Sequence, residues 1–352
     1  MKIHLQRSFF PEIKKDFVSY GAFVIKAFRY SSGVEALEIE NKQCSFIFTP
    51  FKGQQIWHFK VNGEDLSMQT SVKEPQSSSV YLENYGGFLY HCGIISFGAP
   101  DATHPQHGEI PNAQYDSAYI CCEDDENGKY ICLGGELNHD TAFVRKYKFC
   151  PEIKIYENSS LFKIKVTLKN MRAYPMEYMY LCHINFKPKD GAKLLCSAKQ
   201  DAEHIKIYKT SGSKELCEYF DKLEKDITIM NDVGAKGQCY DPEICFGIKY
   251  ESDENGKAYT LQYTDDGACF VSHPTDVLSS AVRWISRTSN EDSMGMVLPA
   301  TSEHLGYEYA KTNNQLKVLE ANASLEFHIE AGYIDKSYAE KIKEKIYSVI
   351  RQ

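Results

Sequence analysis

Hydrophobic and polar residues alternate along much of this chain. In residues 161–169 every second residue, from Phe162 to Leu168, is apolar, and most positions between them are lysine. Residues 324–330 repeat the pattern, with Leu325, Phe327 and Ile329 on one face and His328 on the other. Successive side chains of a strand point to opposite faces, so both segments predict strands with one buried and one solvated face.

Asn-Gly pairs separate several of these segments. They occur at Asn62-Gly63, Asn127-Gly128 and Asn255-Gly256, and this dipeptide is the strongest short signal for a β-hairpin. The 24 tyrosines and 19 phenylalanines also favour strands. We therefore expect an all-β fold, a large antiparallel β-sandwich built mostly from hairpins.

One helix is predicted, over residues 337–350. Tyr338, Ile342, Ile346 and Ile350 recur at four-residue spacing between lysines and glutamates, which indicates an amphipathic helix docked on the sandwich. No repeat and no Pro-rich or Gly/Ser-rich linker divides the chain. We expect one β domain over residues 1–335, with residues 336–352 forming the packed helix.

Composition narrows the choice of partners. The 40 lysines and arginines against 48 acidic residues give a net charge of -8 without a polybasic block, which disfavours nucleic acid and anionic membranes. The start of the chain lacks an apolar signal segment, and no apolar run approaches the roughly 20 residues of a membrane span. The twelve cysteines are scattered, which suits reduced thiols. These features predict a cytoplasmic protein of undetermined oligomeric state.

The common cofactor and hydrolase motifs are missing. The sequence contains no phosphate-binding loop, no dinucleotide fingerprint, no serine-hydrolase elbow and no HExxH helix, so no cofactor is expected. The candidate chemistry lies with histidines instead. His107 and His104 lie in a polar, Pro-containing loop beside Gly108, and His183 lies in a strand whose two faces are both largely apolar. Each of His107 and His183 is either a site residue or an ordinary structural residue on this pattern alone.

The order of several short segments resembles a known family. These segments are Phe51 to Trp57, Asn62 to Leu66, Gly86 to Gly93, His107 to Asn112, His183 to Phe186 and Leu298 to Thr301. Together, from about residue 40 to about residue 335, they resemble the DUF4432 branch of the aldose 1-epimerase, or galactose mutarotase-like, superfamily. The resemblance implies a supersandwich of antiparallel strands with a sugar bound in a cleft on one sheet.

The resemblance also implies roles for individual residues. Mutarotation needs an acid that protonates the ring oxygen and a base that takes the proton of the anomeric hydroxyl. By resemblance, His183 is the acid, His107 helps to hold the sugar, and a glutamate near the C-terminus is the base.

Two positions depart from the family pattern. Glu109 stands where the early motif has arginine, and Leu298 stands where the late motif has the catalytic glutamate. Leucine cannot accept a proton. If the protein is catalytic, another carboxylate must act as the base, and the candidates are Glu109, Glu303 and Glu308.

Sugar recognition can persist without that base. Aromatic and planar polar side chains that suit a pyranose lie in or near the resembling segments, namely Trp57, Trp284, Arg283 and Asn112. We expect an aldose 1-epimerase-like isomerase acting on a free or anionic monosaccharide, with His107 and Glu109 also binding substrate. The alternative is a carbohydrate-binding or sensing protein that uses the same cleft without catalysis. A third, weaker hypothesis is a metal-assisted sugar isomerase or lyase that uses His104 and His107, with or without His183, although we expect no metal.

Overall fold

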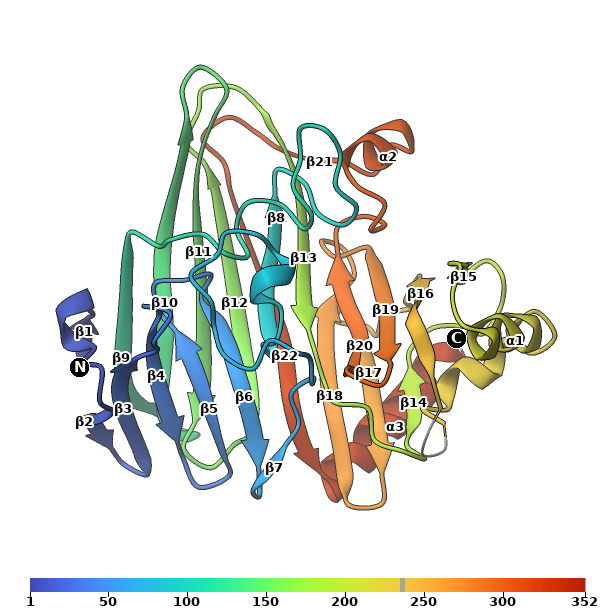
Figure 1. The fold of residues 1–352 in the computed structure, drawn as a ribbon, viewed down its shortest axis with the longest axis horizontal. Helices are drawn as coiled ribbons and strands as arrows, with labels where there is room; N and C mark the ends of the chain where they lie inside the picture. Colours follow the sequence, from blue (N-terminus) through green and yellow to red (C-terminus); the bar gives the residue numbers. More distant parts are fainter. Residues whose placement is uncertain (235–237, 352) are drawn as a thin grey trace.

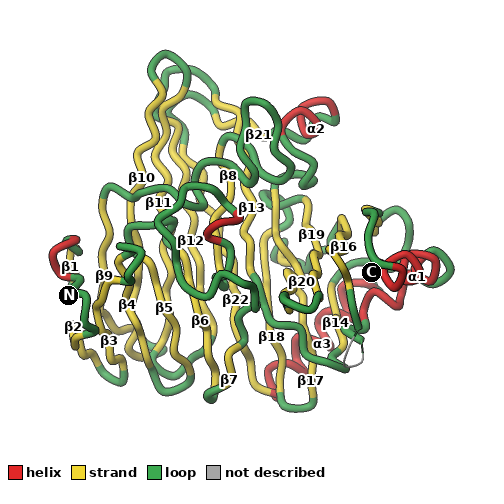
Figure 2. The backbone as a smooth tube through the Cα atoms, in the orientation of Figure 1, coloured by secondary structure: helices red, strands yellow, loops and turns green. Residues whose placement is uncertain are grey.

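The structure is a computed structural model that describes residues 1–234 and 238–351. Two antiparallel sheets lie face to face, and the helices lie at their edges and on one outer face (Figures 1 and 2). The nine-stranded sheet has the order β1 (Lys2–His4), β9 (Ser117–Asp125), β10 (Gly128–Thr141), β11 (Arg145–Tyr156), β12 (Leu161–Asn170), β22 (Ser324–Asp335), β18 (Gly267–Pro274), β17 (Lys257–Thr264), β14 (Lys193–Cys196).

The thirteen-stranded sheet faces the viewer in Figure 1. Its order is β15 (Ile205–Tyr208), β16 (Tyr240–Ile248), β19 (Ser280–Arg287), β20 (Asp292–Ala300), β13 (Met176–Ile184), β8 (Leu89–Ile94), β6 (Gln55–Val61), β5 (Cys44–Thr49), β4 (Glu35–Glu40), β3 (Phe23–Arg29), β2 (Lys15–Tyr20), with β21 (Lys317–Leu319) on β13 and β7 (Glu64–Asp65) on β6. The helices are α1 (Lys214–Leu223), α2 (Tyr307–Thr312) and α3 (Lys336–Ile350), with short 3-10 turns at Arg7–Phe9, Leu82–Asn84 and Ile227–Asn231.

The main core lies between the two sheets. Phe162 of β12 meets Phe46 of β5 and Phe59 of β6, with ring centroids 4.9 Å apart in both contacts. Along β12 the side chains of Phe162, Ile164, Val166 and Leu168 are buried, so the predicted strand and its inner face are confirmed. The predicted all-β sandwich with a C-terminal helix is confirmed as well.

The C-terminal helix uses a slightly different face from the predicted one. Ala339, Ile342, Ile346 and Val349 are the buried residues of α3, whereas Tyr338 is 40% exposed. A constant four-residue spacing drifts around a helix of 3.6 residues per turn, so a straight contact stripe alternates steps of three and four. This stripe packs on β17, β18 and β22, on the outer face of the nine-stranded sheet.

The hairpin predictions are confirmed in two places and wrong in the third. Asn62-Gly63 joins β6 to β7, and Asn127-Gly128 joins β9 to β10. Asn255-Gly256 forms a turn before β17, but the preceding strand β16 belongs to the other sheet. A local turn signal cannot report which sheet the next strand joins. Among the described helices, none is long and apolar enough to cross a membrane.

Candidate functional site

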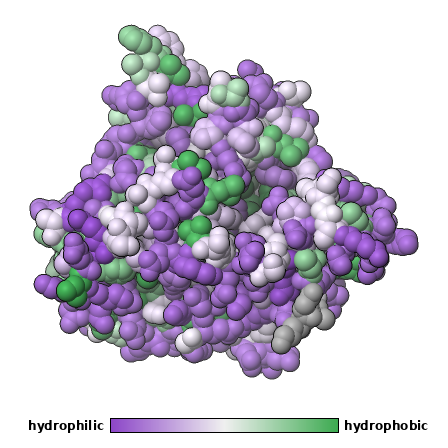
Figure 3. Space-filling view, in the orientation of Figure 1, coloured by the Kyte–Doolittle hydropathy of each residue, from purple (hydrophilic) through white to green (hydrophobic). Residues whose placement is uncertain are grey.

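A cavity of about 380 Å³ opens on the outer face of the thirteen-stranded sheet. Strands β13, β16, β19 and β20 form its floor, and the loops around residues 81–85, 98–107 and 304–305 form its rim. Apolar residues gather around a hollow near the centre of this face (Figure 3). The lining residues are Tyr81, Leu82, Tyr85, Gly98, Ala99, Pro100, Gln106, His107, Leu181, His183, Glu243, Cys245, Val282, Trp284, Leu298, His304 and Leu305.

The strand period selects which side chains reach this cavity. Two residues from each of three strands line it: Leu181 and His183, Glu243 and Cys245, and Val282 and Trp284. The residue between each pair points into the core between the sheets, because successive side chains of a strand alternate. Cys182 and Ile244 accordingly belong to the main core.

His183 is held in one tautomer by its neighbour Asn185. The amide Nδ2 of Asn185 donates to the carbonyl of Gly87 at 3.1 Å, so its Oδ1 faces His183 Nδ1, 2.7 Å away. That oxygen can only accept, so Nδ1 carries the proton and Nε2 keeps a lone pair. The Tyr85 hydroxyl lies 3.2 Å from Nε2. Burial lowers the pKa of His183 to about 3, so the ring is neutral near pH 7.

His107 packs beside His183 in the cavity wall. The two ring centroids are 5.3 Å apart, and Tyr81 packs 4.5 Å from His107 on another side. Burial, followed by the neighbouring His183 and His304, lowers the pKa of His107 well below its usual value. Its buried Nδ1 has no hydrogen-bond partner in the described part of the chain. A buried ring nitrogen without a partner needs an explanation, and a ligand in the adjacent cavity would supply one.

Gly108 explains why the His-Gly pair is needed in this loop. Its φ of +83° lies in the left-handed region, and a Cβ there would stand 2.2 Å from the Ser96 carbonyl oxygen. The chain therefore passes close to the 93–96 segment and turns His107 inward. Glu109 then points away from the cavity, where its carboxylate accepts hydrogen bonds from the amides of Ile94 and Ile95 and from the Tyr147 hydroxyl.

The predicted role of Glu109 as a substrate ligand does not fit this position. Its carboxylate anchors the loop of His107 to the end of β8 instead. Burial raises the pKa of Glu109 to about 7 although its hydrogen bonds oppose the shift.

Three further predicted ligands lie away from the cavity. Trp57 is fully buried and donates its indole N–H to Gln55. Asn112 is also buried and accepts hydrogen bonds from Gln55 and Asn84. Arg283 points into the space between the sheets, where its Nε donates to the Met296 carbonyl oxygen at 3.2 Å. Period-2 alternation is the reason, since Val282 and Trp284 on either side face the cavity.

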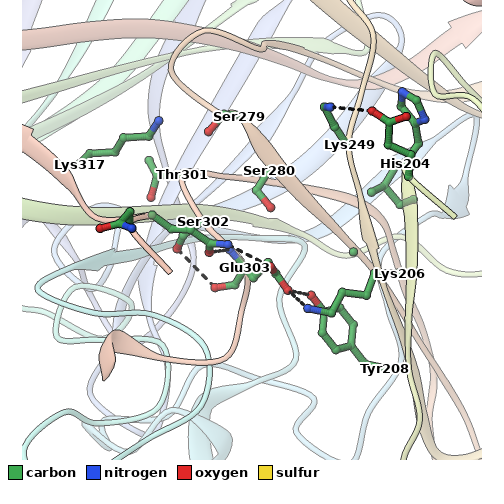
Figure 4. A pocket seen from close by; sticks show the side chains of 15 residues that line it. His204, Lys206, Tyr208, Lys249, Ser279, Ser280, Thr301, Ser302, Glu303 and Lys317 are labelled. Carbon is green, nitrogen blue, oxygen red and sulfur yellow. Dashed lines mark hydrogen bonds and ion pairs between the residues drawn. The ribbon is translucent and has the colours of Figure 1, made fainter. Parts of the chain in front are cut away.

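The two late glutamates predicted as bases are also elsewhere. Glu303 lines a neighbouring cavity, where its carboxylate accepts from Lys206 Nζ at 2.6 Å, from the Tyr208 hydroxyl and from Gln315 (Figure 4). Burial opposes ionisation, but these hydrogen bonds and the lysine charge together lower the pKa of Glu303 to about 2. Glu308 is exposed on α2. Leu298 does lie in the cavity wall, so this wall position carries no carboxylate.

Two titratable cavity residues that could take part in chemistry were missed by the sequence analysis. Glu243 of β16 accepts a hydrogen bond from Trp284 Nε1 at 2.6 Å, which holds its carboxylate at the cavity. His304 has a buried Nδ1 without a partner in the described residues, and burial lowers its pKa. His304 follows the Leu298 to Thr301 motif closely enough to have been found. No motif in the sequence around Glu243 marks it as a site residue.

The cavity thus combines proton carriers with aromatic walls. Three neutral imidazoles and one carboxylate surround it, and Tyr81, Tyr85 and Trp284 supply ring surfaces. Such a set can hold a polar ring and move protons between two of its oxygen atoms. His104 lies outside the lining, paired with Asp101 at 2.8 Å and stacked on Tyr307. No cluster of three or more metal-ligating side chains occurs within the described residues.

Comparisons with known proteins agree with this architecture. A family profile described as "Domain of unknown function (DUF4432)" matches residues 31–332. A structure of a candidate aldose 1-epimerase from Klebsiella pneumoniae superposes with a TM-score of 0.84 at 18% identity, covering 99% of this chain and 96% of that one. A galactose mutarotase-like protein from Clostridium acetobutylicum gives a TM-score of 0.58 at 13% identity, covering 88% of this chain and 98% of that one. At these identities the likeness shows the fold alone.

Two other matches are weaker. A candidate aldose 1-epimerase from Escherichia coli K12 gives a TM-score of 0.53 at 10% identity, covering 85% of this chain and 98% of that one. The major capsid protein of Staphylococcus phage 80alpha is 31% identical over 111 residues, 29% of this chain. The match covers 34% of the capsid protein's length and carries no argument here.

Proposed function

Because the chain belongs to the DUF4432 family and has a galactose mutarotase-like fold, we propose that it binds an aldose in the cavity of His107 and His183 and interconverts its anomers. One observation carries this proposal: the ring nitrogen of His183 and the carboxylate of Glu243 border the same aromatic-walled cavity. The base is then Glu243 of β16, in place of a glutamate at position 298.

Ring opening requires two proton transfers. The Glu243 carboxylate takes the proton of the anomeric hydroxyl, and His183 Nε2 gives a proton to the ring oxygen as the bond between C1 and that oxygen breaks. Rotation about C1–C2 and reclosure, with the two transfers reversed, produce the other anomer. The Trp284 N–H leaves one Glu243 oxygen free to accept this proton, because it binds Oε2.

The tautomer of His183 sets the order of events. In this tautomer Nε2 carries a lone pair, so His183 must take up a proton from solvent before it can act as the acid. The hydrogen bond from Nδ1 to Asn185 favours the charged imidazolium and opposes the effect of burial. His107 and His304 also line the cavity, and their imidazoles are suited to bind other sugar hydroxyls.

Exchange between anomers can be measured directly by NMR saturation transfer on glucose and galactose. We expect the wild type to accelerate exchange, and we expect His183→Ala and Glu243→Gln to abolish most of that acceleration. Binding of sugars without any acceleration would reject the catalytic assignment.

A second function, sugar binding or sensing without catalysis, is favoured by one observation. Leu298 occupies the cavity wall at the position where the family pattern has its catalytic glutamate. Under this alternative Glu243 binds a hydroxyl and transfers no proton, so Glu243→Gln would weaken sugar binding in a protein that never accelerates exchange.

A further inference from the structure

A second cavity of about 360 Å³ lies beside the first on the same sheet face. Strands β16 and β19 line both cavities at positions two residues apart, with Cys245 and Val282 in the first cavity and Gly247 and Ser280 in the second. Leu298 of β20 lines the first cavity, and Thr301, just after the end of β20, lines the second. Two residues of a strand span about 7 Å. The second cavity therefore begins about 7 Å from the first along strands β16 and β19.

The border between the cavities is thin. His304 lines the first cavity and Tyr208 lines the second, and their rings meet edge to face with centroids 4.6 Å apart. Glu303 and His304 are consecutive, so one short stretch of chain contributes to both walls. The two rings therefore form the wall that a ligand reaching from the first cavity into the second must pass over.

The second cavity mixes donors and acceptors. Figure 4 shows Lys317 and Thr301 on one side, Lys206, Tyr208 and Lys249 on the other, and Glu303 between them. Glu203 pairs with Lys249 at 3.6 Å, so two carboxylates stand among three ammonium groups. The hydroxyls of Ser279 and Ser280 have no hydrogen-bond partner within the described residues.

This lining suits a polyhydroxylated ring better than an anion. Sugar hydroxyls both donate and accept, and the wall offers ammonium, hydroxyl, amide and carboxylate groups together. A phosphate or carboxylate substituent would meet the carboxylates of Glu203 and Glu303 as well as the lysines. The volume, close to that of the first cavity, is also more than a single substituent needs.

We propose that the second cavity binds the second ring of a reducing disaccharide whose reducing ring occupies the first cavity. The inference rests on the proposed function for the placement of the reducing ring, and it changes the expected substrate class from a monosaccharide to a reducing disaccharide.

Calorimetric titration tests the proposal. Glucose and galactose are compared with maltose, cellobiose, isomaltose and lactose, which end in glucose, and with β-1,4-galactobiose, which ends in galactose. At least one disaccharide should bind about tenfold more tightly than the monosaccharide at its reducing end. Tenfold corresponds to about 1.4 kcal/mol, the net contribution of one to three hydrogen bonds.

A space-filling variant locates the gain. Ser280→Tyr places a large side chain in the second cavity and should remove the disaccharide advantage while leaving monosaccharide affinity unchanged. Ser45→Tyr is the matched control, because Ser45 is a half-buried serine on β5 of the same sheet, away from both cavities. It should retain the advantage.

Three results would overturn the inference. Equal affinity for monosaccharides and all disaccharides would do so, and so would an equal loss of both in Ser280→Tyr. Tighter binding of glucose 6-phosphate that Lys249→Met and Lys317→Met weaken would assign the cavity to an anion instead.

The same titrations separate this inference from the proposed catalysis. A disaccharide advantage that Ser280→Tyr removes, without acceleration of anomer exchange, supports the second cavity and rejects the catalytic proposal. Accelerated exchange of glucose or galactose without any disaccharide advantage supports the catalytic proposal and rejects the binding of a second ring in the second cavity. Failure of every saccharide to bind overturns both.

Discussion

His183 and His91 lie on neighbouring strands of the same sheet and differ in the face they occupy. The register of β13 and β8 pairs His183 with Tyr90 and Cys182 with His91, so the two imidazoles point to opposite sides. His91 is wholly buried between the sheets, with Nδ1 2.7 Å from the Tyr180 hydroxyl and the ring beside Phe149. His183 borders the outer cavity.

The electrostatics of these two histidines are almost the same. Burial lowers the pKa of each to about 3. A shifted pKa therefore does not identify the functional histidine in this sheet, although such shifts often cluster at sites. The difference lies in what the free ring nitrogen faces: packed core for His91 and an open cavity for His183.

The largest expected effect comes from removing each histidine in turn. His183→Ala should slow anomer exchange by about 10²–10⁴-fold, the usual contribution of a general acid, with little loss of stability. His91→Ala should leave exchange nearly unchanged and lower the free energy of unfolding by about 1–3 kcal/mol, because the Tyr180 hydroxyl loses its buried partner. Saturation-transfer NMR and urea unfolding measure the two quantities. If His91→Ala slowed exchange as much as His183→Ala, the distinction between the two faces would be wrong.

The next comparison concerns two carboxylates. Glu243→Gln should slow exchange by about 10²-fold, because it removes the proposed base. Glu303→Gln is the matched control, with a carboxylate that Lys206 and Gln315 already hold. It should change exchange by less than about twofold. If Glu303→Gln slowed exchange strongly and Glu243→Gln did not, the base would be Glu303 and not Glu243.

A smaller effect is expected from restoring a carboxylate at position 298. In the Glu243→Gln background, Leu298→Glu should recover about tenfold in exchange rate, a fraction of a typical general-base contribution. Recovery should increase from pH 6 to pH 9, since an apolar wall raises the pKa of a carboxyl and keeps it protonated at lower pH. The Leu298→Gln variant in the same background should show no recovery. Equal rescue by glutamine would exclude proton transfer at this position.

The smallest expected effect concerns the anchor of the His107 loop. The folded-state pKa of Glu109, about 7, lies above that of a free glutamate. Protonated Glu109 therefore stabilises the folded protein fully below about pH 4.3, the pKa of a free glutamate. This stabilisation is lost as the pH rises through 7. Glu109→Gln cannot ionise, so its stability relative to wild type should improve by about 1 kcal/mol between pH 6 and pH 8. Urea unfolding at both pH values measures this, and a constant difference would show that Glu109 does not titrate in this range.

Alternation of apolar residues predicted β12, β22 and the sandwich class, and four-residue spacing predicted the C-terminal helix. The same alternation should have separated Arg283 from Trp284, since neighbouring residues of one strand face opposite sides. The order of the family motifs predicted that His107, His183 and Leu298 lie at one site. Glu243 lies 60 residues after His183 in the sequence, and its strand β16 is separated from β13 in the sheet by β19 and β20. No local pattern encodes that proximity. The domain boundary at residue 335 and the cytoplasmic location remain predictions.

A crystal structure of the Glu243→Gln variant with a bound sugar tests the central claim most directly, because the missing base leaves the ring closed. We expect a pyranose between Tyr85 and Trp284, with its anomeric oxygen against residue 243 and its ring oxygen within hydrogen-bond distance of His183 Nε2. A sugar bound away from His183, or one that turns its anomeric carbon away from residue 243, would show that His183 and Glu243 are not the acid and base.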